Sequence, residues 1–190
     1  TNGGNLVCTG GAAQLSYTTG SYRNFAPPYS TATGTCWISF IAQIPSNGSS
    51  WCGLSLFNTF GNEIVFLGDL SGATNWGAQV YGTGGLFKTS NIPVSVQVFL
   101  VARIDFNVSG NLDNTLVWIN PDIGSTPPED GSATLSLPGV DFSGSGNAAN
   151  VIRIRLQQGS NAYALFDEIR LGKTWADVSP TAPTSADADA

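Results

Sequence analysis

The chain has 190 residues and a net charge of −6, with no histidine. That length suffices for one large domain with a sizeable core, and the acidic balance argues against binding to nucleic acid or to an anionic membrane. Only 11% of the residues are charged and no run of ~18 apolar residues could span a membrane. Low charge together with abundant Gly, Ser, Thr, Asn and aromatic residues indicates an exported β protein, extracellular or at the cell surface.

Short runs with strand-like composition, bounded by Gly, Asn, Pro and Ser, follow one another along the chain. Their ranges are 5–11, 13–18, 36–44, 51–58, 62–70, 75–82, 94–106, 114–121, 132–138, 151–158 and 162–172. Helical periodicity is nearly absent, apart from one turn that Thr174 and Asp177 would cap and Pro180 would end. The pattern predicts a β-sandwich or barrel over residues 1–180, followed by a Pro/Ala/Ser/Asp-rich tail or linker at 181–190.

Three cysteines, Cys8, Cys36 and Cys52, are too few for a disulfide scaffold. The segments 36–44 and 51–58 read as a hairpin, in which Cys36 would lie roughly 26 Å from Cys52 at ~3.3 Å per residue. A disulfide needs Cα atoms within about 7 Å, so a Cys36–Cys52 bridge is not expected. An internal bridge would involve Cys8; the alternative is buried free thiols.

Several stretches carry a resemblance to a known group of domains: "TGTCWISFIAQI", "FLVARIDF", "LVWINPDIGSTPPEDG" and "IRIRLQQGSNAYALFDEIRLGKTWADVSP". In order and spacing, from about residue 5 to residue 180, the chain resembles laminin-G/concanavalin A-like domains of large exported bacterial proteins. The resemblance implies an antiparallel two-sheet jelly-roll sandwich of about twelve to fourteen strands. Members of the wider superfamily bind glycans, act in adhesion, or carry glycosidase and lyase sites.

The strand predicted over 162–172 places Asp167 on the same face as Leu165, Ile169 and Leu171. A charge on the more aliphatic face needs a partner, because an unpaired buried carboxylate is costly.

Two partners are considered for Asp167. One is structural, a set of backbone N–H groups or an arginine such as Arg103. The other is a structural Ca²⁺, which the superfamily resemblance supports and for which residues 1–5, "TNGGN", could add carbonyl ligands.

Aromatic rings next to amides are the candidate carbohydrate-binding residues, because rings stack on sugar faces while amides bind hydroxyl groups. In "NWGAQVYG", Trp76 and Tyr81 lie near Asn75 and Gln79, and Trp118 shares its parity with an asparagine in "LVWINP". The alternative is that these rings fill the sandwich or its edges. Trp37 and Trp175 are expected to serve in packing.

No catalytic residue is predicted. Without histidine, Ser-His-Asp and Cys-His nucleophile systems are excluded. Glu63 and Asp69 lie six residues apart, about 20 Å along a strand, and Asp167 and Glu168 point to opposite faces. A glycosidase pair needs carboxyls about 5 Å apart if it is retaining, and such a pair would have to come from different strands.

The sequence therefore favours a non-catalytic glycan-binding or adhesion module of the cell surface, and not an enzyme. The alternative is a structural subunit of an extracellular filament or surface layer. In that reading residues 181–190 contact a neighbouring copy, because ordering such a tail needs an external template. A polysaccharide-active enzyme is the third and disfavoured reading.

Overall fold

The structure is a computed structural model, and parts of the chain are described by it. The described residues are 11–16, 20–29, 34–46, 50–71, 73–109, 112–142, 150–159 and 163–180. Cys8, the N-terminal residues 1–5 and the tail 181–190 lie outside these ranges, and so do the predictions made for them.

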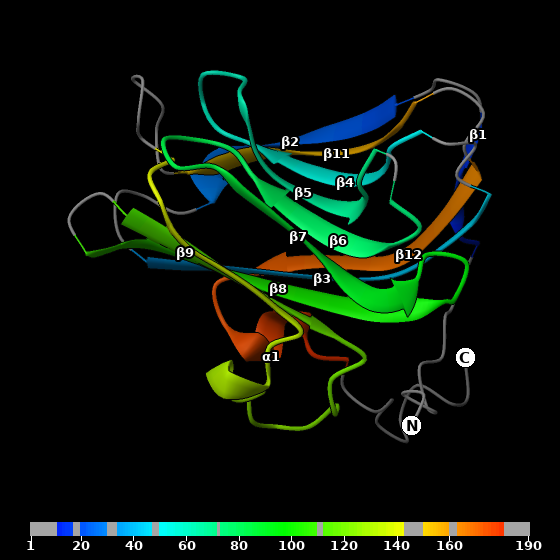
Figure 1. Cartoon of the computed structure of the whole chain (residues 1–190). Coiled ribbons are helices and arrows are strands. Elements are labelled where there is room, and N and C mark those ends of the chain that lie inside the picture. The colour runs from blue at the N-terminus through cyan, green and yellow to red at the C-terminus, as the bar shows by residue number, and fades with distance from the viewer. Residues whose placement is uncertain are drawn as a thin grey trace, which may run out of the picture.

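Two antiparallel sheets of six strands stack face to face, as Figure 1 shows, with two short helical segments on the far side of the lower sheet, the 3₁₀ turn Asp130–Ser132 and α1 (Trp175–Val178). Sheet A has the order β1 (Ala13–Ser16), β12 (Tyr163–Gly172), β3 (Gly34–Ser46), β8 (Val98–Ser109), β9 (Leu112–Ile119) and β10 (Leu135–Val140). Sheet B has the order β2 (Gly20–Tyr29), β11 (Val151–Gln158), β4 (Cys52–Phe57), β5 (Glu63–Asp69), β6 (Asn75–Val80) and β7 (Leu86–Pro93). The architecture is a jelly-roll sandwich, which confirms the predicted fold class.

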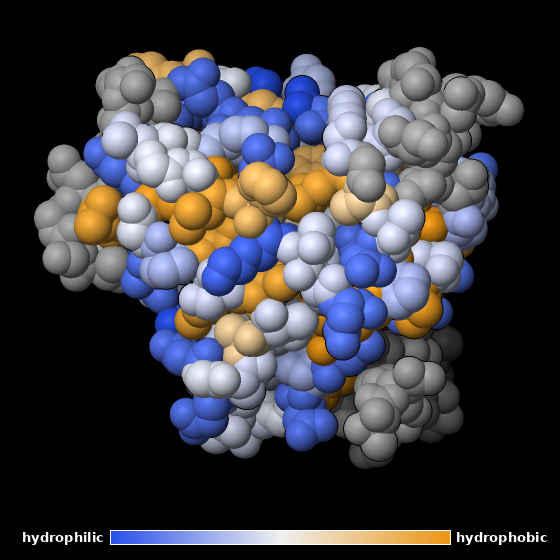
Figure 2. Space-filling view, in the orientation of Figure 1, coloured by the Kyte–Doolittle hydropathy of each residue, from blue (hydrophilic) through white to orange (hydrophobic). Residues whose placement is uncertain are grey.

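The main core lies between the sheets and takes alternate side chains from both. Among its fully buried members are Ile38, Phe40, Leu54, Leu67 and Leu100. In the edge view of Figure 2, hydrophobic residues gather across the middle, with more hydrophilic residues above and below. Alternation along each strand thus sends one set of side chains into the sandwich and leaves the other set for its two outer faces.

The hairpin expected from segments 36–44 and 51–58 is not formed. Cys36 lies on β3 in sheet A and Cys52 lies on β4 in sheet B, because the chain crosses between the layers there. Both are buried free cysteines. Matching hydrophobic parities shows that two strands each have one buried face, but it does not show that they pair with each other.

Burial raises the pKa of the Cys36 thiol to about 12, and burial together with Asp69 raises that of Cys52 to about 12. The thiolate is the reactive form, so in a Cys8→Ser variant we expect both thiols to resist an aromatic disulfide reagent at pH 8 and to react fully in denaturant. Because the folded pKa values exceed the unfolded ones, stability should fall as pH rises from about 9 towards 12. Rapid reaction of either thiol in the native protein would contradict this placement.

A bulge explains why β12 points aliphatic residues and an aspartate to one apparent face. Ala164 and Phe166 enter the core, while Asp167 lies opposite Ile41 on the outer face of sheet A. The register then shifts between Asp167 and Arg170. One extra residue reverses the alternation, so the parity of Asp167 does not continue to Leu171, which packs against the core.

The single predicted helical turn is α1 (Trp175–Val178), and its capping box between Thr174 and Asp177 is formed. Its buried side chains join a second apolar cluster on the outer face of sheet A, with Trp37 and Trp118. Packing of Trp37 and Trp175 was expected and is confirmed. No described helix is long and apolar enough to cross a membrane.

Candidate functional site

A cleft of about 320 Å³ opens on the outer face of sheet B, which is turned away from sheet A. Leu54, Leu67 and Ala78 of this sheet enter the core, so their alternating neighbours, such as Phe66 and Gln79, face outward. The lining consists of Trp51, Glu63, Phe66, Leu70, Ser71, Gln79, Tyr81, Arg155 and Gln157. The cleft therefore draws its side chains from three strands, β11, β5 and β6, and from the segments next to β4, β5 and β6.

The floor of the cleft is an aromatic ring lying on a glycine. A Cβ at Gly53 would lie 2.7 Å from Cζ of Phe66, so only glycine allows the ring this position. Trp51 meets Phe66 edge to face, with ring centroids 6.3 Å apart. Phe66 is buried, and its ring gives the cleft an apolar base beneath polar walls.

One wall carries a hydrogen-bonded carboxylate. Gln157 Nε2 donates to Ser55 Oγ at 2.9 Å and to Glu63 Oε1 at 3.3 Å. Gln157 and Ser55 are themselves buried. The amide therefore holds the Glu63 carboxylate in one orientation, and Glu63 is the only acidic side chain among the described residues of the lining.

Arg155 provides a cation on the same wall. Its guanidinium lies 4.4 Å from the centre of the Phe57 ring, and its buried Nε has no hydrogen-bond partner among the described residues. Burial lowers the pKa of Arg155, a direction in which the neighbouring Arg153 also acts, while Glu63 raises it. Arg155 is in the lining of the cleft, where a guanidinium is suited to bind an anionic group of a ligand.

Tyr81 lies close enough to Glu63 for the two groups to interact electrostatically. Burial and then the Glu63 carboxylate raise the pKa of Tyr81 to about 12. The phenol therefore keeps its proton through neutral and mildly alkaline pH, and it can serve as a proton donor there.

The structure separates the predicted carbohydrate-binding residues. Gln79 and Tyr81 line the cleft, and Asn75 is half-buried at the start of β6. Trp76 is 0% exposed in the main core, and its Nε1 donates to the carbonyl of Val96. It therefore does not meet the requirement of exposure that ring stacking sets.

Trp118 is also buried, but it lies on the outer face of sheet A and not between the sheets. It is 2% exposed and stacks on Trp37 at 5.8 Å in the outer cluster of sheet A. Arg103 covers both rings at 5.6 and 5.8 Å. Trp76 thus lies in the core, Trp118 lies under a loop, and Tyr81 lines the cleft, so these three rings do not form one groove.

Asp167 is half-buried, and its Oδ1 accepts the backbone N–H of Glu168 at 2.8 Å. Arg103, the arginine considered as its partner, binds Asp105 and Asp130 instead. Within the described ranges, no three His, Cys, Asp or Glu side chains are grouped as a metal site requires. A structural Ca²⁺ at Asp167, with carbonyl ligands from residues 1–5, stays a prediction.

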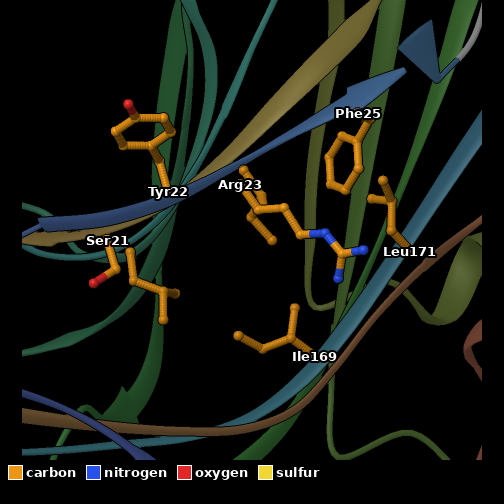
Figure 3. Close-up of a pocket in the computed structure, with 8 residues that line it drawn as sticks. Ser21, Tyr22, Arg23, Phe25, Ile169 and Leu171 are labelled. Atoms are coloured by element: carbon orange, nitrogen blue, oxygen red, sulfur yellow. The ribbon is translucent and has the colours of Figure 1, made fainter. Parts of the chain in front are cut away.

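A larger cavity, of about 550 Å³, lies between β2 and β11 of one layer and β12 of the other. Figure 3 shows Arg23 pointing into it and Tyr22 pointing away from it. Its lining is Ser21, Tyr22, Arg23, Phe25, Ile154, Leu156, Ile169 and Leu171. Among the described residues this lining holds no carboxylate that could act as a base, so the cleft on sheet B is the better candidate site.

The sequence analysis did not assign the two charged residues of this cleft, Glu63 and Arg155, to a site. Arg155 and Gln157 share a parity in "VIRIRLQQ", and this is the outward face. That alternation was visible, but nothing in one strand shows that Glu63 of another strand lies next to it.

No protein-family model matches the chain, and no curated protein matches it. Among solved structures, a family 7 alginate lyase, A1-II′, in complex with product is 13% identical with a TM-score of 0.51, covering 84% of this chain and 74% of that one. The binding domain of botulinum neurotoxin serotype D is 9% identical with a TM-score of 0.56, covering 85% and 38%. A further structure of alginate lyase A1-II′ is 11% identical with a TM-score of 0.47, covering 77% of this chain and 65% of that one, which is under two thirds of its length. The two likenesses with TM-scores above 0.5 agree with the jelly-roll sandwich fold.

These neighbours correct the function expected from the sequence. Among them is the alginate lyase A1-II′ with a TM-score of 0.51, a polysaccharide lyase captured with its product. The prediction of a non-catalytic glycan-binding or adhesion module that is not an enzyme is therefore overturned, and the filament or surface-layer alternative falls with it. The third hypothesis, a polysaccharide-active enzyme, which the sequence disfavoured, takes its place.

Proposed function

We propose that the chain is a polysaccharide-active enzyme that cleaves a uronate-containing polysaccharide by β-elimination in the cleft on sheet B. The observation that carries this proposal is that the described lining of the cleft combines one carboxylate, Glu63, one phenol, Tyr81, and one guanidinium, Arg155. Glycoside hydrolysis ordinarily uses two carboxyl groups that flank the bond. The described lining offers only Glu63, so elimination suits these groups better than hydrolysis.

β-Elimination from a uronate needs three things of the protein. A cation or donor must hold the sugar carboxylate, because this makes the neighbouring C5 proton more acidic. A base must take that proton, and an acid must protonate the departing oxygen. In the cleft, Arg155 and Gln79 are placed for the first task, Glu63 for the second and Tyr81 for the third.

The proposed step balances as follows. Glu63 takes the C5 proton, the C4=C5 double bond forms as the C4–O bond breaks, and the Tyr81 phenol gives its proton to the leaving oxygen. Proton exchange with solvent then restores both groups. The bond from Gln157 to Glu63 keeps the base in one orientation, and Tyr81 stays protonated because its pKa is raised to about 12.

The fold comparison supports the substrate class. The alginate lyase A1-II′ at a TM-score of 0.51 was captured with its product in a variant that has phenylalanine in place of a tyrosine. We further propose that the protein acts outside the cell, in keeping with its low content of charged residues, 11%, and that it belongs to the laminin-G-like part of the fold class.

The test is to incubate the purified protein with polyuronates and with neutral polysaccharides. With polyuronates, and not with neutral polysaccharides, we expect ultraviolet absorbance from the new double bond. This absorbance should rise with the number of new chain ends. Arg155→Gln should reduce the rate by at least tenfold. Arg23→Gln is the matched control, since this arginine faces the cavity between the sheets.

Two outcomes would contradict the proposal. New reducing ends without the absorbance of a double bond would indicate hydrolysis. No new chain ends from any polysaccharide would exclude cleavage altogether.

A further inference from the structure

A single row of side chains crosses all six strands of sheet B on its outer face. Each member lies opposite the next in the strand register, so all six share one face of the sheet. The row runs Tyr22, Arg155, Ser55, Phe66, Gln79, Phe87. With strands ~4.8 Å apart, its five steps span about 24 Å.

The two ends of the row are its most exposed members. Phe87 on β7 is 70% exposed and Tyr22 on β2 is 66% exposed, whereas Phe66 in the middle is 4% exposed. Both end strands are edge strands of the sheet. Both rings are therefore available to a ligand that is long enough to cross the sheet along a line through the cleft.

The ring of Tyr22 is held in place without being buried. The guanidinium of Arg153 lies 5.0 Å from its centre, and Nε of Arg153 donates to Asn24 Oδ1 at 2.7 Å. Figure 3 confirms that Tyr22 points away from the cavity between the sheets. The ring is therefore presented on the outer face before any ligand arrives.

We infer that the polysaccharide lies across the strands along this row, with Phe87 and Tyr22 as stacking platforms at the two edges of the sheet. This inference rests on the proposed function and adds the direction and the extent of the binding track. Sugars at the ends stack their apolar faces on the two rings. The sugar at the centre meets Arg155 and Gln79, next to the groups that carry out the cleavage.

Chain length is the variable that tests the track. Phe87→Ala and Tyr22→Ala should each raise KM for a long polyuronate about fivefold and leave kcat nearly unchanged, because a lost stacking platform weakens binding without touching the reacting bond. Oligomers too short to reach the edges should show no change. Phe60→Ala is the control, since this phenylalanine is 65% exposed in the turn between β4 and β5 and lies outside the row.

Binding is measured separately by the retardation of each variant in a gel containing polyuronate. The track would be overturned if polyuronate is cleaved and the KM values of Phe87→Ala and Tyr22→Ala equal that of Phe60→Ala. The proposed function would then still stand. If no polyuronate is cleaved, the proposed function fails. The track is then supported by lost retardation in Phe87→Ala and Tyr22→Ala, and overturned by retardation equal to that of Phe60→Ala.

Discussion

Replacing Tyr81 with phenylalanine is expected to lower kcat on polyuronate by about 10²- to 10⁴-fold while KM changes little. The variant keeps the ring and removes only the proton donor, and general acid catalysis contributes about this much to a rate. A circular dichroism spectrum and a melting temperature close to those of the unchanged protein would show that the loss is chemical. Full activity in Tyr81→Phe would remove this residue from the mechanism.

The pH dependence follows from the same residue. Burial and Glu63 raise the pKa of Tyr81 to about 12, so the donor form persists well above the ordinary value near 10. The loss of the Tyr81 proton should therefore not limit kcat below about pH 11. Removing the carboxylate in Glu63→Gln should move the pKa of Tyr81 back towards its ordinary value, which a tyrosine ultraviolet titration would detect.

Trp118→Ala is expected to destabilise the protein by about 3–5 kcal/mol, the usual cost of removing a large buried ring. The ring is 2% exposed, stacks on Trp37, and donates through Nε1 to the carbonyl of Glu129 at 3.2 Å. Its loss would leave a cavity beneath the loop that Arg103 and Asp130 hold against sheet A.

Denaturant unfolding of Trp118→Ala measures this cost, and Trp51→Ala is the contrasting variant because Trp51 lies in the lining of the cleft. Trp118→Ala should bind polyuronate normally while folded, and Trp51→Ala should lose binding with a smaller change in stability. Normal stability with weakened binding in Trp118→Ala would reverse the roles assigned to these two tryptophans.

Most strands were predictable because each has alternating residues bounded by breakers. The two that were missed, β2 and β7, are the edges of sheet B. Edge strands bury less, so their hydrophobic signal is weak, and β2 also contains Pro27 and Pro28, which suit an edge but argue against a central strand.

The site was harder to predict than the fold because it depends on which strands are neighbours. Trp76 and Tyr81 have opposite parities in one strand, so alternation alone could have separated the buried ring from the one in the cleft. The approach of Glu63 to Gln157, which are 94 residues apart in sequence, depends on sheet order, and local patterns carry no information about it.

The bulge in β12 also marks where this strand tolerates a change in its number of residues. Three steps along β12, from Asp167 to Arg170, match only two along β3, from Ile41 to Ser39. Glu168, with φ of 51°, is the residue in the left-handed region there. A deletion of one residue at this point would leave Phe166 and Leu171 on their present faces, whereas the same deletion elsewhere in the strand would turn Arg170 into the space between the sheets. Natural insertions and deletions in β12 should therefore concentrate at this one position.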